Sequence, residues 1–203
     1  MSTTIKDEEI QAQILQAAKQ LFQLHGFRRV TIDDIAKAIG KARSSLYYYY
    51  KTKEEILDAV IAAEISELMS AIAAAVGQAP STEEKIEAFF LTKLQTILEK
   101  RVFFNALDEG MDASELSSHQ KTKLAVHQQI WQQEGALLSR IITEGTRRGE
   151  LTKLSHKDQE NLVFALLSSL HGIKREMLIR NDFSNMEPSV HILVRFIIHG
   201  LKK

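Results

Sequence analysis

The residues of this chain whose types and spacing best suit chemistry lie in one stretch, GKARSSLYYYYKTKEE, from Gly40 to Glu55. The stretch brings one arginine, two serines and four consecutive tyrosines together with three lysines. On a helix, four successive residues sweep roughly 300° of the circumference at about 100° each, so the tyrosines cannot all point into one core. The outward-facing tyrosines are either an idle surface feature or part of a binding surface.

The charge around this stretch differs from that of the whole chain. Lysine and arginine together number 26, and aspartate and glutamate number 26, so the formal net charge is zero. Residues 26–53, however, hold seven basic residues against the two acidic residues Asp33 and Asp34, a net charge of +5. The basic residues are Arg28, Arg29, Lys37, Lys41, Arg43, Lys51 and Lys53. A basic segment on a neutral protein is a patch that attracts polyanions.

Catalytic and metal-binding residues are not indicated by the sequence. The absence of cysteine excludes disulfides, thiolate metal sites and cysteine nucleophiles. The seven histidines are scattered: His119 and His127 are eight residues apart, as are His191 and His199, which is not the i, i+4 spacing of a helical metal site. No H-E-x-x-H motif, phosphate-binding glycine loop or nucleophile elbow occurs. We therefore expect that this protein is not an enzyme and that it binds no cofactor and no metal ion.

Composition predicts a globular protein. The chain has 203 residues, of which 44% are hydrophobic and 26% charged, so it can bury a substantial core. The N-terminus, MSTTIKDEEI, lacks the basic start and apolar run of a signal peptide, and no later segment approaches 18 uninterrupted apolar residues. We expect neither export nor membrane spanning, and a cytoplasmic location, which the lack of cysteine also fits.

The elements that position the stretch are helices, because breakers separate periodic segments and strand signals are nearly absent. A first helix is predicted from about residue 7 to residue 25, ended by Gly26. Thr31 and Asp34 have the spacing of a short capping box, and Gly40 ends the helix that they begin. A further short helix must then carry Leu46 and the tyrosines. Two short helices around a tight glycine turn, after a longer supporting helix, are a helix-turn-helix.

The run LFQLHGFRRVTIDDIAKAIGKARSSLYYYYKTKEEIL, residues 21–57, resembles the DNA-binding domain of the TetR family of bacterial transcriptional repressors. The resemblance covers about the first 60 residues and is carried by Phe22, Gly26, Phe27, Thr31, Ile35, Ala36, Gly40, Leu46, Tyr47 and residues 51–53. It implies an all-α fold with a helix-turn-helix DNA-binding domain at residues 1–54. It also implies a larger helical domain for ligand binding and dimerisation at residues 55–203.

The resemblance also implies roles in binding double-stranded DNA. The residues implied to face bases are Arg43, Ser44, Ser45 and Tyr48. Those implied to contact phosphate are Thr31, Lys41, Tyr47, Tyr49 and Lys53. Arg43 suits guanine, because a guanidinium can bond O6 and N7 together, although a contact with phosphate alone remains the alternative. Tyr50 shares the face of Leu46 and is expected in the core, whereas Tyr49 either reaches the backbone or packs under the first helix.

Two positions depart from the family pattern. Lys41 and Ala42 replace the usual small apolar residue and serine after the glycine, and loss of a serine N-cap typically costs around 1 kcal/mol. Asp33 lies where some family members carry a base-reading side chain. It could accept from cytosine N4 or cap its own helix, and capping is the favoured interpretation.

The remaining sequence predicts helices at about residues 52–76, 82–105, 116–148, 157–179 and 188–201. The first of these links the two domains, and the resemblance implies that a ligand moving it would change the separation of two recognition helices in a dimer. The last two carry apolar stripes, which the resemblance assigns to a dimer interface: Leu162, Leu166, Leu170, Ile173, Met177, Val190, Leu193, Val194 and Ile197. The alternative is that both stripes pack inside the monomer.

The middle region is expected to hold a pocket for a small hydrophobic or aromatic effector. Its candidate lining residues are Phe89, Phe90, Phe103, Phe104, Met111, His127, Trp131 and Leu138. The expected function is thus a ligand-responsive repressor that binds an inverted-repeat operator as a homodimer. The alternative function belongs to a different class of protein. It is a helical interaction protein whose basic patch binds a membrane surface or an acidic partner without sequence specificity. In that case Arg43 would matter no more than Lys51.

Overall fold

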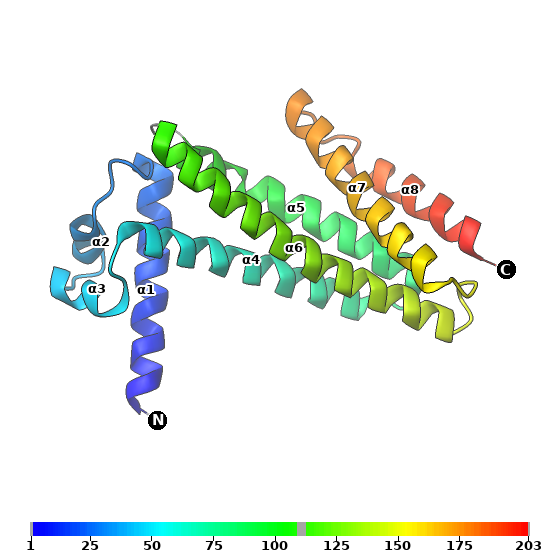
Figure 1. Ribbon diagram of the computed structural model, residues 1–203, viewed down its shortest axis with the longest axis horizontal. Coiled ribbons are helices and arrows are strands. Elements are labelled where there is room, and N and C mark those ends of the chain that lie inside the picture. The colour runs from blue at the N-terminus through cyan, green and yellow to red at the C-terminus, as the bar shows by residue number, and fades with distance from the viewer. Residues whose placement is uncertain (1, 109–112, 203) are drawn as a thin grey trace. The chain divides into compact units, whose positions relative to one another are not determined.

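The computed structural model describes the backbone of residues 2–108 and 113–202, and the side chains of residues 6–101, 103, 124 and 127–202. The described residues form eight helices and no strand, which confirms the predicted all-α class (Figure 1). The chain divides into two compact units. Unit 1 comprises residues 1–66 and 99–125, and unit 2 comprises residues 67–98 and 126–203. The expected domain boundary between residues 54 and 55 stays a prediction.

Unit 1 contains α1 (Ser2–His25), α2 (Ile32–Ala38), α3 (Arg43–Tyr49) and the first part of α4 (Lys53–Gln78). Figure 1 shows α2 and α3 beside α1, and α2 contacts both of the other helices. Phe22 and Leu46 are fully buried, and the rings of Phe22 and Phe27 lie with their centroids 5.3 Å apart. This apolar core holds α3 against the other two helices and fixes which of its faces meets solvent.

The capping signals before α2 form as predicted. The Thr31 side chain accepts a hydrogen bond from the Asp34 backbone N–H at 3.2 Å, and the Thr31 backbone N–H donates to Asp34 Oδ2 at 2.9 Å. At the other end, Gly40 has φ +66°, which L side chains rarely adopt. The Lys41 N–H then donates to the Ala36 carbonyl at 2.9 Å, which closes α2 and turns the chain toward α3.

Helix α4 supplies core residues to both units. Ile56, Val60 and Ile61 are buried in unit 1, and Ile72 and Val76 are buried in unit 2. Among the described helices, α4 is also the one long and apolar enough to cross a membrane by length and composition alone. Its apolar positions are instead accounted for by these two cores.

Unit 2 is built from the second part of α4, the first part of α5 (Thr82–Asp108), the second part of α6 (Ala113–Arg147), α7 (His156–Arg180) and α8 (Met186–Leu201). One apolar core joins all five, with Phe89, Phe90 and Leu138 among its fully buried members. Ser155 caps α7 by accepting from the Asp158 N–H at 3.1 Å. Helices α7 and α8 lie side by side and run in opposite directions (Figure 1).

The two apolar stripes predicted for a dimer interface are part of this core. Leu166, Leu170, Met177, Val190 and Val194 are buried in the single chain. The other four predicted positions pack against the same core, namely Leu162, Ile173, Leu193 and Ile197. The five buried side chains thus pack inside the monomer, which was the alternative, whereas the four half-buried ones keep exposed surface and the dimer interface stays a prediction. An amphipathic pattern marks a face for burial without saying against what.

Candidate nucleic-acid interface

The register of α3 sorts the four tyrosines. Leu46 is fully buried, so the residues on its face turn inward and the opposite face meets solvent. Tyr48 is 73% exposed, whereas Tyr47, Tyr49 and Tyr50 are half-buried. Burial raises the pKa of the Tyr50 phenol, as expected for a side chain turned toward the core. Tyr48 is therefore the tyrosine most fully presented on the surface.

Arg43, the first residue of α3, is exposed and held by two neighbours. Its Nε lies 3.1 Å from Asp33 Oδ1, and its Nη1 donates to Asp33 Oδ2 at 3.2 Å. Its Nη2 donates to the Tyr47 hydroxyl at 2.8 Å. The Tyr47 hydrogen bond, followed by the Asp33 charge, raises the pKa of Arg43, so the group carries its full charge in this position. The guanidinium is thus oriented before any ligand arrives.

Asp33 therefore has a role that sequence reasoning missed. Capping of α2 is performed by Thr31 and Asp34, whose pKa is lowered by the hydrogen bond from the Thr31 side chain. Asp33 reaches across the turn to Arg43 instead, so neither capping nor a free acceptor for cytosine describes it in this structure. Its partner Arg43 is ten residues away, beyond the turn, and no local sequence pattern predicts that these two side chains pair.

Tyr49 contacts α1. Its hydroxyl donates to Asp7 Oδ1 at 2.8 Å, and this bond is the main reason that the pKa of Tyr49 is raised. A phenol has one proton, and a phosphate needs a donor. In this conformation Tyr49 therefore does not fit the predicted phosphate contact, and the structure shows the alternative of packing under the first helix. Tyr48 meets its ring edge-on, with centroids 4.9 Å apart.

The three lysines of the stretch have different surroundings. Lys53 Nζ donates to the Phe27 carbonyl at 2.9 Å and lies 4.2 Å from the centroid of the Phe27 ring. Lys53 thereby ties the loop after α1 to the start of α4. Lys51 Nζ donates to the Tyr47 carbonyl at 2.6 Å, at the negative end of α3. Lys41 is exposed in the turn before α3, and the phosphate contacts expected of Lys41 and Lys53 stay predictions.

The N-terminus of α3 lacks a side-chain cap, as the sequence predicts. Ala42 is the N-cap residue, with φ −71° and ψ 147°, and no side chain accepts from the first turn. Ser44 is exposed and Ser45 is half-buried in that turn, and Thr31 is exposed at the start of α2. The first turn of α3 therefore presents uncapped backbone amides, which suit phosphate oxygens. At the start of α2, by contrast, the Thr31 hydroxyl donates to Asp34 Oδ2 at 2.7 Å, so the phosphate contact expected of Thr31 stays a prediction.

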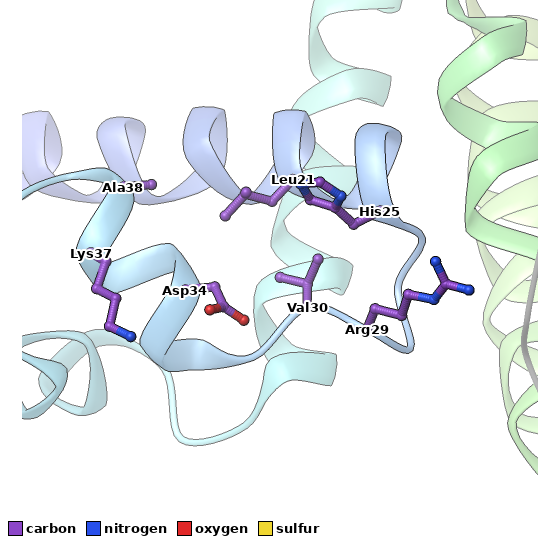
Figure 2. Close-up of a pocket in the computed structure, with 7 residues that line it drawn as sticks. All are labelled: Leu21, His25, Arg29, Val30, Asp34, Lys37 and Ala38. Atoms are coloured by element: carbon purple, nitrogen blue, oxygen red, sulfur yellow. The ribbon is translucent and has the colours of Figure 1, made fainter.

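An open pocket of about 520 Å³ lies between α1 and α2, lined by Leu21, His25, Arg29, Val30, Asp34, Lys37 and Ala38. Figure 2 shows Lys37 and Arg29 at opposite ends, with Asp34 and Val30 between them. The cations do not converge on one point, and the Asp34 carboxylate is engaged by Thr31. This pocket adds positive charge beside the start of α2 without forming a closed site.

Residues 14–60 match the model of the family described as bacterial regulatory proteins, tetR family. Residues 14–60 therefore form a TetR-family DNA-binding domain. The match contains the whole of α2 and α3, together with the part of α1 that packs on them. Arg43, Tyr47 and Tyr48 therefore lie on the helix-turn-helix of a TetR-family domain.

Two relatives show how far the likeness extends. The chain is 35% identical over 54 residues to the HTH-type transcriptional regulator TtgR of Pseudomonas putida, a stretch that covers 27% of this chain and 26% of TtgR. It is 31% identical over 88 residues to EthR of Mycolicibacterium smegmatis, which covers 41% of each chain. The chain thus spans between a quarter and two fifths of the length of these curated relatives.

Solved structures extend the likeness of fold to nearly the whole chain. A TetR transcription regulator from Haloarcula marismortui has a TM-score of 0.72 at 19% identity, with 97% of this chain and 100% of that chain covered. The fatty acid degradation regulator FadR from Bacillus halodurans has a TM-score of 0.63 at 20% identity, covering 91% and 93%. At these identities the comparison shows a shared fold.

The effector pocket expected in the middle region stays a prediction, and the structure places six of its eight candidate lining residues. Phe89, Phe90 and Leu138 are fully buried core residues of unit 2, and Phe103 is buried in unit 1. His127 and Trp131 stack near His171, with the Trp131 and His171 ring centroids 5.3 Å apart. The side chain of Phe104, and Met111 altogether, lie outside the described residues.

Proposed function

We propose that this protein is a transcriptional repressor that binds an inverted-repeat operator in double-stranded DNA as a homodimer and is released by a small effector. The observation that carries the proposal is Arg43, an exposed guanidinium oriented by Asp33 and Tyr47 on the recognition helix of a TetR-family domain. A preoriented fork of this kind suits guanine O6 and N7 in the major groove. Such a regulator works in the cytoplasm, where bacterial DNA lies, and we expect no catalytic activity.

The remaining residues of the stretch supply the rest of the interface. Tyr48 is exposed beside Arg43, so its ring and hydroxyl suit a thymine methyl or a sugar, and Ser44 and Ser45 lie in the same turn. Thr31, Lys41, Tyr47 and Lys53 are proposed to contact phosphates, which set the register of α3 on the duplex. Phosphate contacts raise affinity for every sequence, whereas base contacts create preference.

The DNA-binding claim is tested by selecting bound duplexes from random DNA. The affinity for the selected duplex is then compared with that for a scrambled duplex, at several salt concentrations. We expect Arg43→Ala to reduce the ratio of the two affinities by about tenfold to a hundredfold, the value of a bidentate contact with a base. Arg140→Ala removes an exposed arginine of α6 and is the matched control, which should leave the ratio unchanged.

Two results would contradict the claim. Equal affinity for all duplexes, with anionic vesicles bound as tightly as DNA, would favour the nonspecific interaction protein instead. An unchanged preference after Arg43→Ala would show that Arg43 contacts phosphate only.

The proposed dimer uses the exposed faces of α7 and α8 rather than their buried stripes. Phe164, Leu178 and Ile179 of α7 and Ile192 and Phe196 of α8 are large apolar side chains exposed to solvent. Five such side chains on two adjacent helices are more than the scattered single residues of an ordinary surface. Covering these faces with those of a second copy would bury them in a four-helix interface.

Sedimentation tests this assignment. Phe196 is 67% exposed, so its replacement should leave the fold of one chain intact. We expect Phe196→Glu to weaken the dimer by about thirtyfold or more, as for a central aromatic residue of an interface. Arg140→Glu places the same charge on α6 and should leave the dimer unchanged. A wild-type monomer at micromolar concentration would contradict the assignment.

A further inference from the structure

Asp33 is an acidic side chain within the basic segment that carries the proposed DNA-binding surface. Residues 26–53 hold seven basic residues and two acids, and one of these acids, Asp34, belongs to the capping box of α2. Asp33 contacts Arg43 instead: its Oδ1 lies 3.1 Å from Arg43 Nε, and its Oδ2 accepts from Arg43 Nη1 at 3.2 Å. Any group that binds the Arg43 guanidinium must therefore approach a carboxylate.

Stability does not explain this contact. The pair as a whole is open to water, and exposed ion pairs contribute little to the free energy of unfolding. The Asp33 Oδ1 atom itself is shielded from water and accepts no hydrogen bond within the described part of the chain, which costs stability. A contact that stabilises the fold so little, made to the residue best suited to base readout, points to a role in binding.

Arg43 can bind a base while it keeps its contact with Asp33. A guanidinium has five N–H donors. One bonds Asp33 Oδ2 and one bonds the Tyr47 hydroxyl, so three of the five remain for a ligand among the contacts that the structure describes. Guanine needs two donors, one for O6 and one for N7. The carboxylate of Asp33 can therefore stay beside Arg43 when guanine is bound.

A phosphate and a guanine respond differently to that carboxylate. A phosphate carries a full negative charge, whereas guanine O6 and N7 are neutral acceptors. Even a phosphate that displaces Asp33 from Arg43 lies beside the carboxylate, which repels it and offsets much of the attraction of the guanidinium. The hydrogen bonds to guanine lose far less. A nearby acid thus creates specificity by penalising the wrong ligand.

We propose that Asp33 is a specificity-determining residue, whose carboxylate disfavours phosphate on the Arg43 guanidinium and leaves Arg43 available for guanine. Tyr47 also holds Arg43, through its hydroxyl and through its ring, whose centroid lies 5.3 Å from the guanidinium carbon. Arg43 therefore keeps an orienting contact when the charge of Asp33 is removed. The inference rests on the proposed function, because it requires that Arg43 meets DNA, and it adds an acid that need not touch DNA.

The charge of Asp33 is tested with Asp33→Asn on the selected and scrambled duplexes, because asparagine keeps an acceptor for Arg43. We expect the affinity for the scrambled duplex to rise by about threefold to fivefold at low salt, the value of one unit charge at roughly 5 Å in water. The affinity for the selected duplex should change by less than about twofold, since the guanine acceptors are neutral. The salt dependence on the scrambled duplex should steepen by about one phosphate contact.

Two further substitutions separate charge from orientation. Asp33→Glu keeps the charge and should bind the scrambled duplex as the wild type does. Asp33→Ala removes the charge and the acceptor, so it should raise the affinity for the scrambled duplex and also lower that for the selected one. Glu99→Gln removes an acid at an exposed position of α5 and is the control for net charge, which should change neither affinity. A role in folding alone would not move the salt dependence.

The outcomes separate this inference from the proposed function. If the wild type prefers its selected duplex but Asp33→Asn binds the scrambled duplex with unchanged affinity and salt dependence, the inference is wrong and the repressor proposal stands. An equal rise after Glu99→Gln would also overturn the inference, because net charge alone would then explain the effect. A wild type without any sequence preference would contradict the proposed function, and the inference with it.

Discussion

The two units of this protein place their charges in opposite environments. In unit 1, the Arg43–Asp33 pair is open to water, with side chains 60% and 43% exposed. In unit 2, the Lys93–Glu134 pair is buried, with side chains 3% and 0% exposed. Water can replace either partner of an exposed pair, so the pair is weak and can be exchanged for a base or a phosphate. A buried partner has no such replacement, and its charge constrains whatever binds nearby.

Unit 1 also has a buried acid, which sharpens the contrast. Glu64 of α4, with a side chain 7% exposed, accepts from Lys19 of α1 at 2.5 Å and from Lys100 of α5 at 2.6 Å. Both of its oxygens are therefore paired. Glu134 in unit 2 has only one of its two oxygens paired among the described residues. The cluster around Glu64 is thus fully paired, whereas Glu134 keeps one buried acceptor unused.

The largest expected loss of stability comes from breaking the buried Lys93–Glu134 pair. Lys93→Met leaves the Glu134 carboxylate buried without a partner, so we expect the free energy of unfolding to fall by about 3–5 kcal/mol. Urea unfolding at neutral pH measures it. The double variant Lys93→Met with Glu134→Leu should recover most of the loss, because it removes both charges. The control is Lys157→Met, an equal change at an exposed position of α7. If Lys93→Met unfolds at the same urea concentration as this control, the pair is not desolvated.

The next effect depends on pH. Burial lowers the pKa of His171 to about 4, below its ordinary value of 6.5. The unfolded chain thus takes up this proton more readily than the folded one. The contribution of neutral His171 to the free energy of unfolding is fully present above pH 6.5 and is lost as the pH falls toward 4. Because solvent partly screens this ring, we expect about 2 kcal/mol. Urea unfolding at pH 7 and pH 4.5 should show a smaller loss for His171→Phe than for the wild type, and equal losses would contradict the assignment.

A smaller effect should stabilise unit 1. Ala42 already has the extended backbone of an N-cap residue but no side-chain acceptor. We expect Ala42→Ser to raise the free energy of unfolding by about 1 kcal/mol by capping α3. Thermal unfolding measures the change. Ala38→Ser, at an exposed position near the end of α2, is the control, and it should not stabilise the protein. A destabilised Ala42→Ser variant would mean that the turn cannot accept a cap.

The smallest expected change in stability comes from breaking the exposed Arg43–Asp33 pair. Because both side chains are largely exposed, Asp33→Ala should shift the midpoint of thermal unfolding by less than about 2 °C. Its effect should appear in DNA binding instead, since Arg43 loses the contact that orients it. We expect a drop in sequence preference smaller than that of Arg43→Ala, measured with the same selected and scrambled duplexes. A larger loss of stability than that of Lys93→Met would reverse the comparison between the units.

The recognition helix could be predicted closely because its signals are local. The Thr31–Asp34 capping box, the turn at Gly40 and the burial of Leu46 all depend on residues within a few positions of each other. Chain neighbours are spatial neighbours in a helix, so such patterns translate directly into geometry. Asp33 was misjudged for the same reason, because its partner Arg43 lies beyond the turn.

The buried ion pair of unit 2 could not be predicted from the sequence. Lys93 and Glu134 look like two of many charges on long helices, and only packing shows that they share one core. Their separation along the chain is too large for a helical pattern to connect them. A lysine between Leu91 and Leu94, within an apolar run, was the one local signal that Lys93 is buried.

The sequence by itself determined the helices, their caps and the register of the tyrosines, because these follow from backbone hydrogen bonding and helical periodicity within a few residues. The tertiary structure alone decided the partners. It placed five side chains of the apolar stripes of α7 and α8 in the chain's own core, paired Asp33 with Arg43, and paired Lys93 with Glu134 inside the core. The physical reason is that burial and charge pairing depend on which distant segments meet, and helical periodicity carries no information about that.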